Sequence, residues 1–189
     1  MRKVILVHGW DGSPEKDWFP WVTGQLKSKG YDVIVPSMPN PESPEIDAWV
    51  TYLANEVKEY DQETVFVGHS IGCQTIMRYF EKQTTKAKAG IFVAGWFNLT
   101  NISDWEQAIA KPWIETNINY EKVKNGFLKP IKVILGDNDK LVPYQETAQQ
   151  FKEKLNAEII MVPNAGHFNP SDGYNEFPKL IELIETLGN

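Results

Sequence analysis

Short runs of aliphatic and β-branched residues recur along the chain, and they alternate with stretches whose apolar residues follow a helical period. The apolar runs predict strands near 3–8, 32–36, 64–69, 89–94, 131–136 and 158–162. The helical periodicity predicts helices near 18–29, 46–60, 70–83, 144–156 and 175–187. Strands that are apolar throughout and are separated by helices are typical of a parallel sheet covered on both faces. The pattern therefore predicts a three-layer α/β fold with a compact, mostly parallel six-stranded sheet.

The stretch at 95–129 interrupts this alternation and carries Trp96, Trp105 and Trp113 among polar residues. It follows a central strand, and α/β sheets bind ligands beyond the carboxyl ends of their strands. We therefore expect 95–129 to form a small lid or pocket wall within a single domain that spans residues 1–189, with Trp96 nearest the site. The alternative is a connecting helix whose tryptophans pack on the core.

Composition adds little to the fold but argues against several classes of function. The 189 residues carry a net charge of −6 without a cluster of lysine or arginine, which argues against nucleic acids and anionic membrane surfaces as partners. No apolar run approaches the roughly 20 residues that span a bilayer, and the first strand begins almost at Met1, so we expect a cytoplasmic protein. One cysteine and three dispersed histidines predict no disulfide and no metal site, and no nucleotide-binding motif indicates a cofactor.

The most informative motif is Gly-His-Ser-Ile-Gly at residues 68–72, which lies between an apolar run and a helical pattern. This is G-x-S-x-G at the end of a buried strand and the start of a helix, the setting of a nucleophile elbow. On such a sharp turn a serine hydroxyl stands clear of the backbone and reaches both a base and a bound carbonyl carbon. Ser70 is therefore the predicted nucleophile, and the alternative is a plain turn in which it caps the helix.

A serine nucleophile needs a base, and the chain offers His8, His69 and His167. His167 lies on a loop after the last predicted strand, which fits the order Ser, Asp, His of α/β-hydrolases, so we predict that it is the base. The alternative is a surface histidine without chemistry. His69 adjoins Ser70 and should bond to the backbone or core, whereas His8 should brace the loop after the first strand.

Two aspartates, Asp137 and Asp139, follow the predicted strand at 131–136 and compete for the role of the acid. The acid of a triad holds the imidazole in the right tautomer and stabilises the imidazolium. The segment resembles the G-x-x-D-x-x-V-P pattern of α/β-hydrolases, which favours Asp139. Asp137 would then shape the turn.

Backbone N–H groups should complete the site as an oxyanion hole. One donor is predicted to be Ile71, the residue after the nucleophile. The other should come from the loop after the first strand, where Trp10 is the better candidate and Asp11 the alternative. We also expect Trp96 and Phe168 to line the substrate pocket.

Over nearly its whole length the chain resembles the small α/β-hydrolase-fold serine hydrolases grouped as YdeN-like proteins and retinoblastoma-binding protein nine. The matching segments are His8-Gly9-Trp10, Asp17-Trp18-Phe19-Pro20-Trp21, Pro36–Pro41, Gly68–Cys73, Asp139 with Val142-Pro143, and Gly166-His167-Phe168. The resemblance implies a compact hydrolase sheet that lacks the first two strands of larger relatives. It also implies a triad of Ser70, Asp139 and His167.

These residues together predict a metal-independent serine hydrolase without a cofactor, and within that class a carboxylesterase of small or medium acyl esters. Its partner would be a small-molecule ester or amide. Amidase or aminopeptidase activity and thioesterase activity use the same chemical steps and stay open. From another class, the alternative is a non-catalytic binding or regulatory protein on a hydrolase fold.

Overall fold

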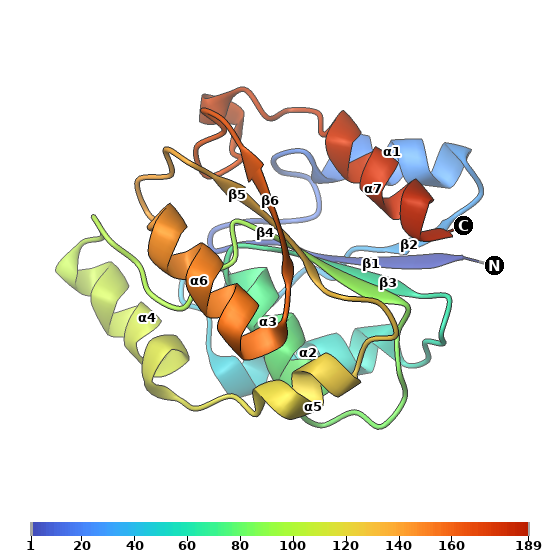
Figure 1. The fold of residues 1–189 in the computed structure, drawn as a ribbon, viewed down its shortest axis with the longest axis horizontal. Coiled ribbons are helices and arrows are strands. Elements are labelled where there is room, and N and C mark those ends of the chain that lie inside the picture. The colour runs from blue at the N-terminus through green and yellow to red at the C-terminus, as the bar shows by residue number, and fades with distance from the viewer. Residues whose placement is uncertain (1, 189) are drawn as a thin grey trace.

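The predicted apolar runs form one six-stranded sheet, in which the strand order is β2-β1-β3-β4-β5-β6 (Figure 1). This computed structural model describes residues 2–188. The strands are β1 (Lys3–Val7), β2 (Asp32–Ile34), β3 (Val65–His69), β4 (Ala89–Val93), β5 (Lys132–Gly136) and β6 (Glu158–Val162). Every pair of neighbouring strands is parallel, so the predicted sheet is confirmed. Because β2 lies on one side of β1 and β3 on the other, the order reverses between β1 and β3.

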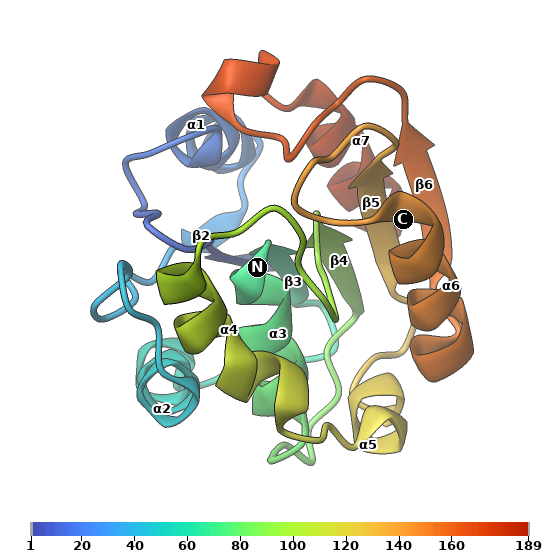
Figure 2. The same cartoon turned by 90° about the vertical axis from the view of Figure 1, so that its left-hand side faces the viewer.

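Helices cover both faces of the sheet (Figures 1 and 2). They are α1 (Phe19–Ser28), α2 (Ile46–Val57), α3 (Ile71–Phe80), α4 (Asp104–Glu115), α5 (Tyr120–Asn125), α6 (Tyr144–Leu155) and α7 (Pro178–Gly188). Side chains on β1 alternate between two buried clusters. Val4 and Leu6 pack with α1 and α7, whereas Ile5 and Val7 pack with α2, α3 and α6. This alternation gives the three predicted layers.

The segment at 95–129 contains two helices that the apolar pattern did not indicate. Helix α4 begins with a capping box, in which Ser103 Oγ accepts from the Glu106 N–H and the Glu106 carboxylate accepts from the Ser103 N–H at 2.6 Å. Near the end of α4, Trp113 is buried, and its indole donates to Pro44 O at 2.9 Å. Arg78 on α3 donates to Trp113 O at 2.8 Å, which ties this end of α4 to the body.

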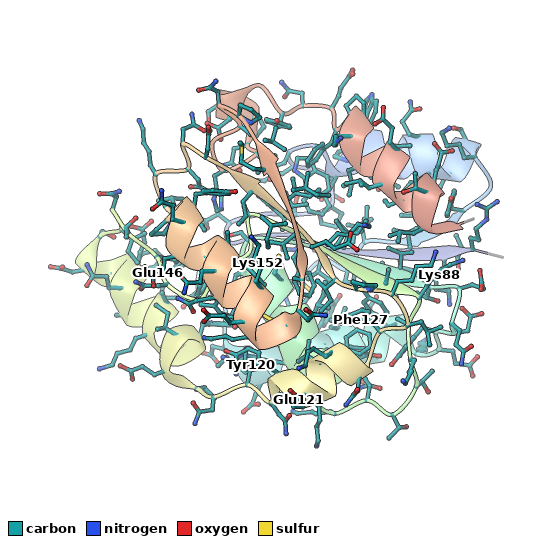
Figure 3. The ribbon with its side chains drawn as sticks, viewed as in Figure 1. Lys88, Tyr120, Glu121, Phe127, Glu146 and Lys152 are labelled. Atoms are coloured by element: carbon teal, nitrogen blue, oxygen red, sulfur yellow. The ribbon has the colours of Figure 1, made fainter. Side chains whose placement is uncertain are left out.

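The residues after α4 also pack on the body of the protein. The ring centroids of Tyr120, at the start of α5, and Phe97 lie 5.9 Å apart, and those of Phe127, beyond α5, and Phe80 lie 4.3 Å apart. Tyr120 and Phe127 are labelled in Figure 3. Among residues 2–188, no helix is both long enough and apolar enough to cross a lipid bilayer.

Candidate active site

The turn between β3 and α3 holds Ser70 in a backbone conformation that non-glycine residues rarely adopt. Its φ is 52° and its ψ is −121°, which places the side chain on a sharp elbow. The flanking glycines permit this turn, because a Cβ on Gly72 would lie 2.3 Å from Val7 O. A Cβ on Gly68 would lie 2.7 Å from the backbone nitrogen of Cys73. The sequence thus forms the elbow by letting strand and helix approach more closely than any side chain allows.

A cavity of about 190 Å³ opens at the carboxyl ends of β1 and β3, where the strand order reverses. This is the place at which open α/β sheets bind ligands. Ser70, His167 and Trp10 all line the cavity, although they come from different ends of the chain. The structure therefore brings the predicted nucleophile, base and oxyanion loop to one hollow.

The predicted base and acid are paired. His167 Nδ1 lies 2.7 Å from Asp139 Oδ2, and the Asp139 side chain is only 2 % exposed. The other carboxylate oxygen accepts from the backbone N–H groups of Leu141 at 2.8 Å and Val142 at 3.1 Å. Burial alone would raise the pKa of Asp139, but its bond to His167 and these two amides outweigh burial and hold the pKa below its ordinary value.

Asp139 orients the ring of His167, because in the neutral imidazole the proton lies on Nδ1, beside the carboxylate, and Nε2 is the acceptor. Within the described part of the chain, no protein group bonds to His167 Nε2. This nitrogen is therefore the one that can take a proton in the cavity.

Three contacts hold the loop that carries His167. His69 Nε2 donates to His167 O at 2.9 Å, Asp172 Oδ2 accepts from the His167 N–H at 2.9 Å, and Asn138 Oδ1 accepts from the Gly166 N–H at 2.7 Å. Burial and, second to it, the neighbouring His167 lower the pKa of His69 to about 3, so its ring stays neutral. The predicted backbone bond of His69 is confirmed, whereas the sequence analysis missed Asp172.

His8 braces the loop after β1, as predicted. Its Nδ1 lies 2.8 Å from Gly9 O and its Nε2 accepts from the Met38 N–H at 3.0 Å, which requires the proton on Nδ1. Burial lowers the pKa of this histidine, which agrees with a ring whose Nε2 accepts a backbone N–H. Two backbone segments are thereby held against one ring, and the loop at 9–12 keeps a defined position beside Ser70.

The predicted oxyanion donors differ in availability. Asp11 N–H donates to Pro41 O at 2.8 Å, so it cannot also serve a substrate. Among residues 2–188, no backbone carbonyl accepts from the N–H of Trp10 or of Ile71, the first residue of α3. Of the two candidates in the loop after β1, only the Trp10 N–H is therefore free to bind an oxyanion.

Asp137 lies outside this arrangement. It is exposed, and its Oδ1 accepts from the Asn164 N–H at 2.8 Å. Asp137 therefore shapes the loop before His167 by a bond across two loops, rather than within its own turn.

The two predicted pocket residues do not line the cavity. Phe168 is fully buried and stacks on Phe177 with ring centroids 5.4 Å apart, because its φ of 59° turns its side chain into the core under α7. Trp96 is also fully buried, but its indole Nε1 donates to Ser70 Oγ at 3.2 Å. Both residues are thus core residues, and the expectation that they form the pocket wall is wrong.

Other residues of the segment at 95–129 wall the cavity instead. They are Leu99, Ile102 and Glu106, and the sequence analysis missed all three. Leu99 and Ile102 also line a groove of about 640 Å³ that runs along α4, so the groove and the cavity share a wall. The spacing Ser103-x-x-Glu106 is a capping-box signal and could have revealed the start of α4 at this place. Among residues 2–188, no three histidine, cysteine, aspartate or glutamate side chains gather as a metal site would require.

Comparison with known proteins gives consistent matches along the chain. The profile of the serine hydrolase family matches residues 4–186. The YdeN hydrolase of Bacillus subtilis (strain 168) is 25 % identical over 188 residues, which cover 98 % of this chain and 95 % of YdeN. The serine hydrolase RBBP9 of Rattus norvegicus is 26 % identical over 192 residues, which cover 98 % of this chain and 95 % of RBBP9.

Solved structures show the same fold. The crystal structure of the ydeN gene product from B. subtilis superposes with a TM-score of 0.88 at 24 % identity, over 99 % of this chain and 98 % of that one. Est1E from Butyrivibrio proteoclasticus gives a TM-score of 0.68 at 17 % identity, over 98 % of this chain and 85 % of that one. The predicted α/β-hydrolase fold is therefore confirmed.

Proposed function

Because the chain belongs to the serine hydrolase family, we propose that it is a carboxylesterase of small or medium acyl esters with Ser70, His167 and Asp139 as its triad. One observation carries the proposal. The 2.7 Å contact between His167 Nδ1 and Asp139 Oδ2 lies behind a cavity that Ser70 and His167 line together. A non-catalytic binding protein would have no need of a histidine oriented by a buried carboxylate beside a strained serine.

The proposed reaction uses these residues in the following order. His167 Nε2 takes the Ser70 hydroxyl proton as Ser70 Oγ attacks the ester carbonyl carbon. The N–H groups of Ile71 and Trp10 bind the resulting oxyanion. The carbon–oxygen bond to the alcohol then breaks, His167 gives its proton to the departing alcohol, and an acyl-enzyme remains. Water that loses a proton to His167 attacks the acyl group, and Ser70 leaves with the proton that His167 returns.

The groove along α4 supports a substrate with a medium acyl chain. Leu99 and Ile102 line both the cavity and the groove, so an acyl chain that extends from Ser70 into the groove would contact these apolar side chains. Burying each methylene of such a chain contributes about 0.8 kcal/mol. The chain would therefore bind along the wall that the segment at 95–129 supplies.

The charge of the cavity favours a neutral or cationic substrate. Asp11, Asp17 and Glu106 line it, and none of the described lining residues is lysine or arginine. A coenzyme A thioester carries several phosphate charges, and acidic walls would repel it. This supports an ester or amide over such a thioester, and a carboxylesterase stays the proposal.

The direct test is labelling with a fluorophosphonate together with hydrolysis of p-nitrophenyl acetate and butyrate. We expect labelling at Ser70, and Ser70→Ala should lose both labelling and turnover, because removal of a triad serine costs about a million-fold in kcat. Ser28→Ala is the matched control, since Ser28 is exposed at the end of α1 and should change neither result. An unlabelled wild-type protein would support the binding protein instead, and a labelled Ser70→Ala would refute the nucleophile.

A further inference from the structure

The hydroxyl oxygen of Ser70 accepts a hydrogen bond from a tryptophan that forms no part of the triad. Trp96 Nε1 lies 3.2 Å from Ser70 Oγ, and the Trp96 side chain has no exposed surface. The indole nitrogen can only donate, so it bonds to a lone pair of the serine oxygen. The hydroxyl hydrogen of Ser70 is not engaged in this bond, because the serine oxygen accepts in it.

The position of this indole is tied to the elbow by the backbone around it. Trp96 O accepts from Gln74 Nε2 at 2.9 Å, and Gln74 lies on α3, which begins directly after Ser70. The Ser70 N–H donates to Val93 O at 2.8 Å, at the end of the strand that leads to Trp96. The turn between them is tight, since Ala94 has a φ of 46° and a Cβ on Gly95 would lie 3.0 Å from Cys73 Sγ. The backbone contacts on either side therefore fix the positions of both the Trp96 indole N–H and Ser70 Oγ.

We propose that the Trp96 indole N–H is a catalytic hydrogen-bond donor to Ser70 Oγ. It stabilises negative charge on that oxygen at the two moments when charge is present there. In acylation, charge appears as the hydroxyl proton moves to His167 and the Oγ–carbon bond forms. In deacylation, it appears as that bond breaks and before His167 returns the proton. This inference rests on the proposed serine hydrolase function.

The contribution should be larger than that of an ordinary hydrogen bond, for two reasons. Trp96 is fully buried, so water does not compete for the indole N–H. The oxygen gains charge during the reaction, and hydrogen bonds to charged groups contribute more than those between neutral groups. Because the bond already exists before substrate binds, no reorganisation is needed when charge develops.

The test compares Trp96→Phe with Trp113→Phe. The first change keeps an aromatic ring and removes the N–H, and we expect kcat and the fluorophosphonate labelling rate each to fall by about 10- to 100-fold, the range for a bond to a charged atom. KM should stay within about twofold, because Trp96 does not line the cavity. Trp113 is equally buried and also loses one indole bond, to Pro44 O, so its variant controls for stability.

The outcomes separate this inference from the proposed function. A folded Trp96→Phe that reacts within threefold of the wild type would overturn the inference, and so would an equal loss in Trp113→Phe. A wild-type protein that fails to react with the fluorophosphonate would refute the proposed function itself.

If Trp96→Phe does not fold, the indole N–H can be observed by ¹⁵N NMR in folded proteins. We expect one buried indole signal to shift when Ser70→Ala removes its acceptor, and to shift again when the wild-type serine is phosphonylated. If no buried indole signal shifts in either case, the inference is overturned.

Discussion

Replacing Asp139 with asparagine should stop catalysis by reversing the tautomer of His167. Asp139 Oδ1 accepts from two backbone N–H groups, those of Leu141 and Val142. In Asp139→Asn the amide oxygen must take this position, because an NH₂ group there would face two donors. The NH₂ group then points at His167 Nδ1, which must become an acceptor, and the proton moves to Nε2.

An Nε2 that carries a proton cannot take the proton of Ser70. The corresponding tautomer change in a well-studied serine protease lowers kcat about 10,000-fold. We expect a loss of about 1,000- to 10,000-fold here, which corresponds to about 4–5.5 kcal/mol of barrier. The fold should survive, since both backbone amides keep an acceptor.

The assay is kcat for p-nitrophenyl acetate, with thermal melting to check the fold and ¹⁵N NMR of the imidazole to identify the tautomer. Asp137→Asn is the matched control. Its Oδ1 accepts only the Asn164 N–H, which an asparagine oxygen accepts equally well, so turnover should change less than about threefold. The reasoning fails if Asp139→Asn keeps a tenth of the wild-type kcat, or if Asp137→Asn is the less active enzyme.

Three further predictions concern stability and substrate choice. Burial lowers the pKa of His69 from 6.5 in the unfolded chain to about 3 in the folded protein. Between these values only the unfolded chain binds the proton, so the stability present above pH 6.5 is lost as the pH falls. Urea unfolding between pH 6.5 and 4.5 should show a loss approaching about 1.4 kcal/mol per pH unit, and an unchanged slope in His69→Gln would contradict this. Gly72→Ala should destabilise the protein by at least about 1–3 kcal/mol, because its Cβ would lie 2.3 Å from Val7 O. Gly24→Ala in α1 meets nothing within 4 Å and should instead add about 0.5–1 kcal/mol, so melting curves that rank the two the other way would refute the argument. Ile102→Trp should narrow the passage between cavity and groove and lower kcat/KM for p-nitrophenyl octanoate about tenfold or more relative to acetate, whereas an equal effect on both esters would rule out this path.

The sequence was sufficient for the parts of the molecule that depend on neighbouring residues. Apolar runs and helical periods located all six strands and the helices that pack on the sheet, because burial on both faces leaves a continuous apolar pattern. The elbow is equally local, since glycines on either side of Ser70 mark a turn that only small residues allow. Helix α4 was missed for the opposite reason, because it is largely exposed and buries only Ala110 and Trp113.

Tertiary structure decided the roles that depend on which way a side chain points. Trp96 directly follows a strand in the sequence, a position typical of pocket residues. The left-handed conformation of Ala94 instead directs the Trp96 side chain into the core, where its indole N–H donates to Ser70 Oγ. The choice of Trp10 over Asp11 as the oxyanion donor depends on Pro41. Its carbonyl oxygen accepts the Asp11 N–H, although Pro41 lies on a different loop.

The histidines show the same division. Their positions along the chain were enough to predict which of them is the base of a serine hydrolase. The bond from His69 to His167 O could not be predicted in this way, because it joins residues 98 positions apart. A side chain's direction is set by backbone dihedrals and by partners that meet only when the sheet assembles. Local sequence therefore determines which chemistry is present, and the packed structure determines which atoms face one another.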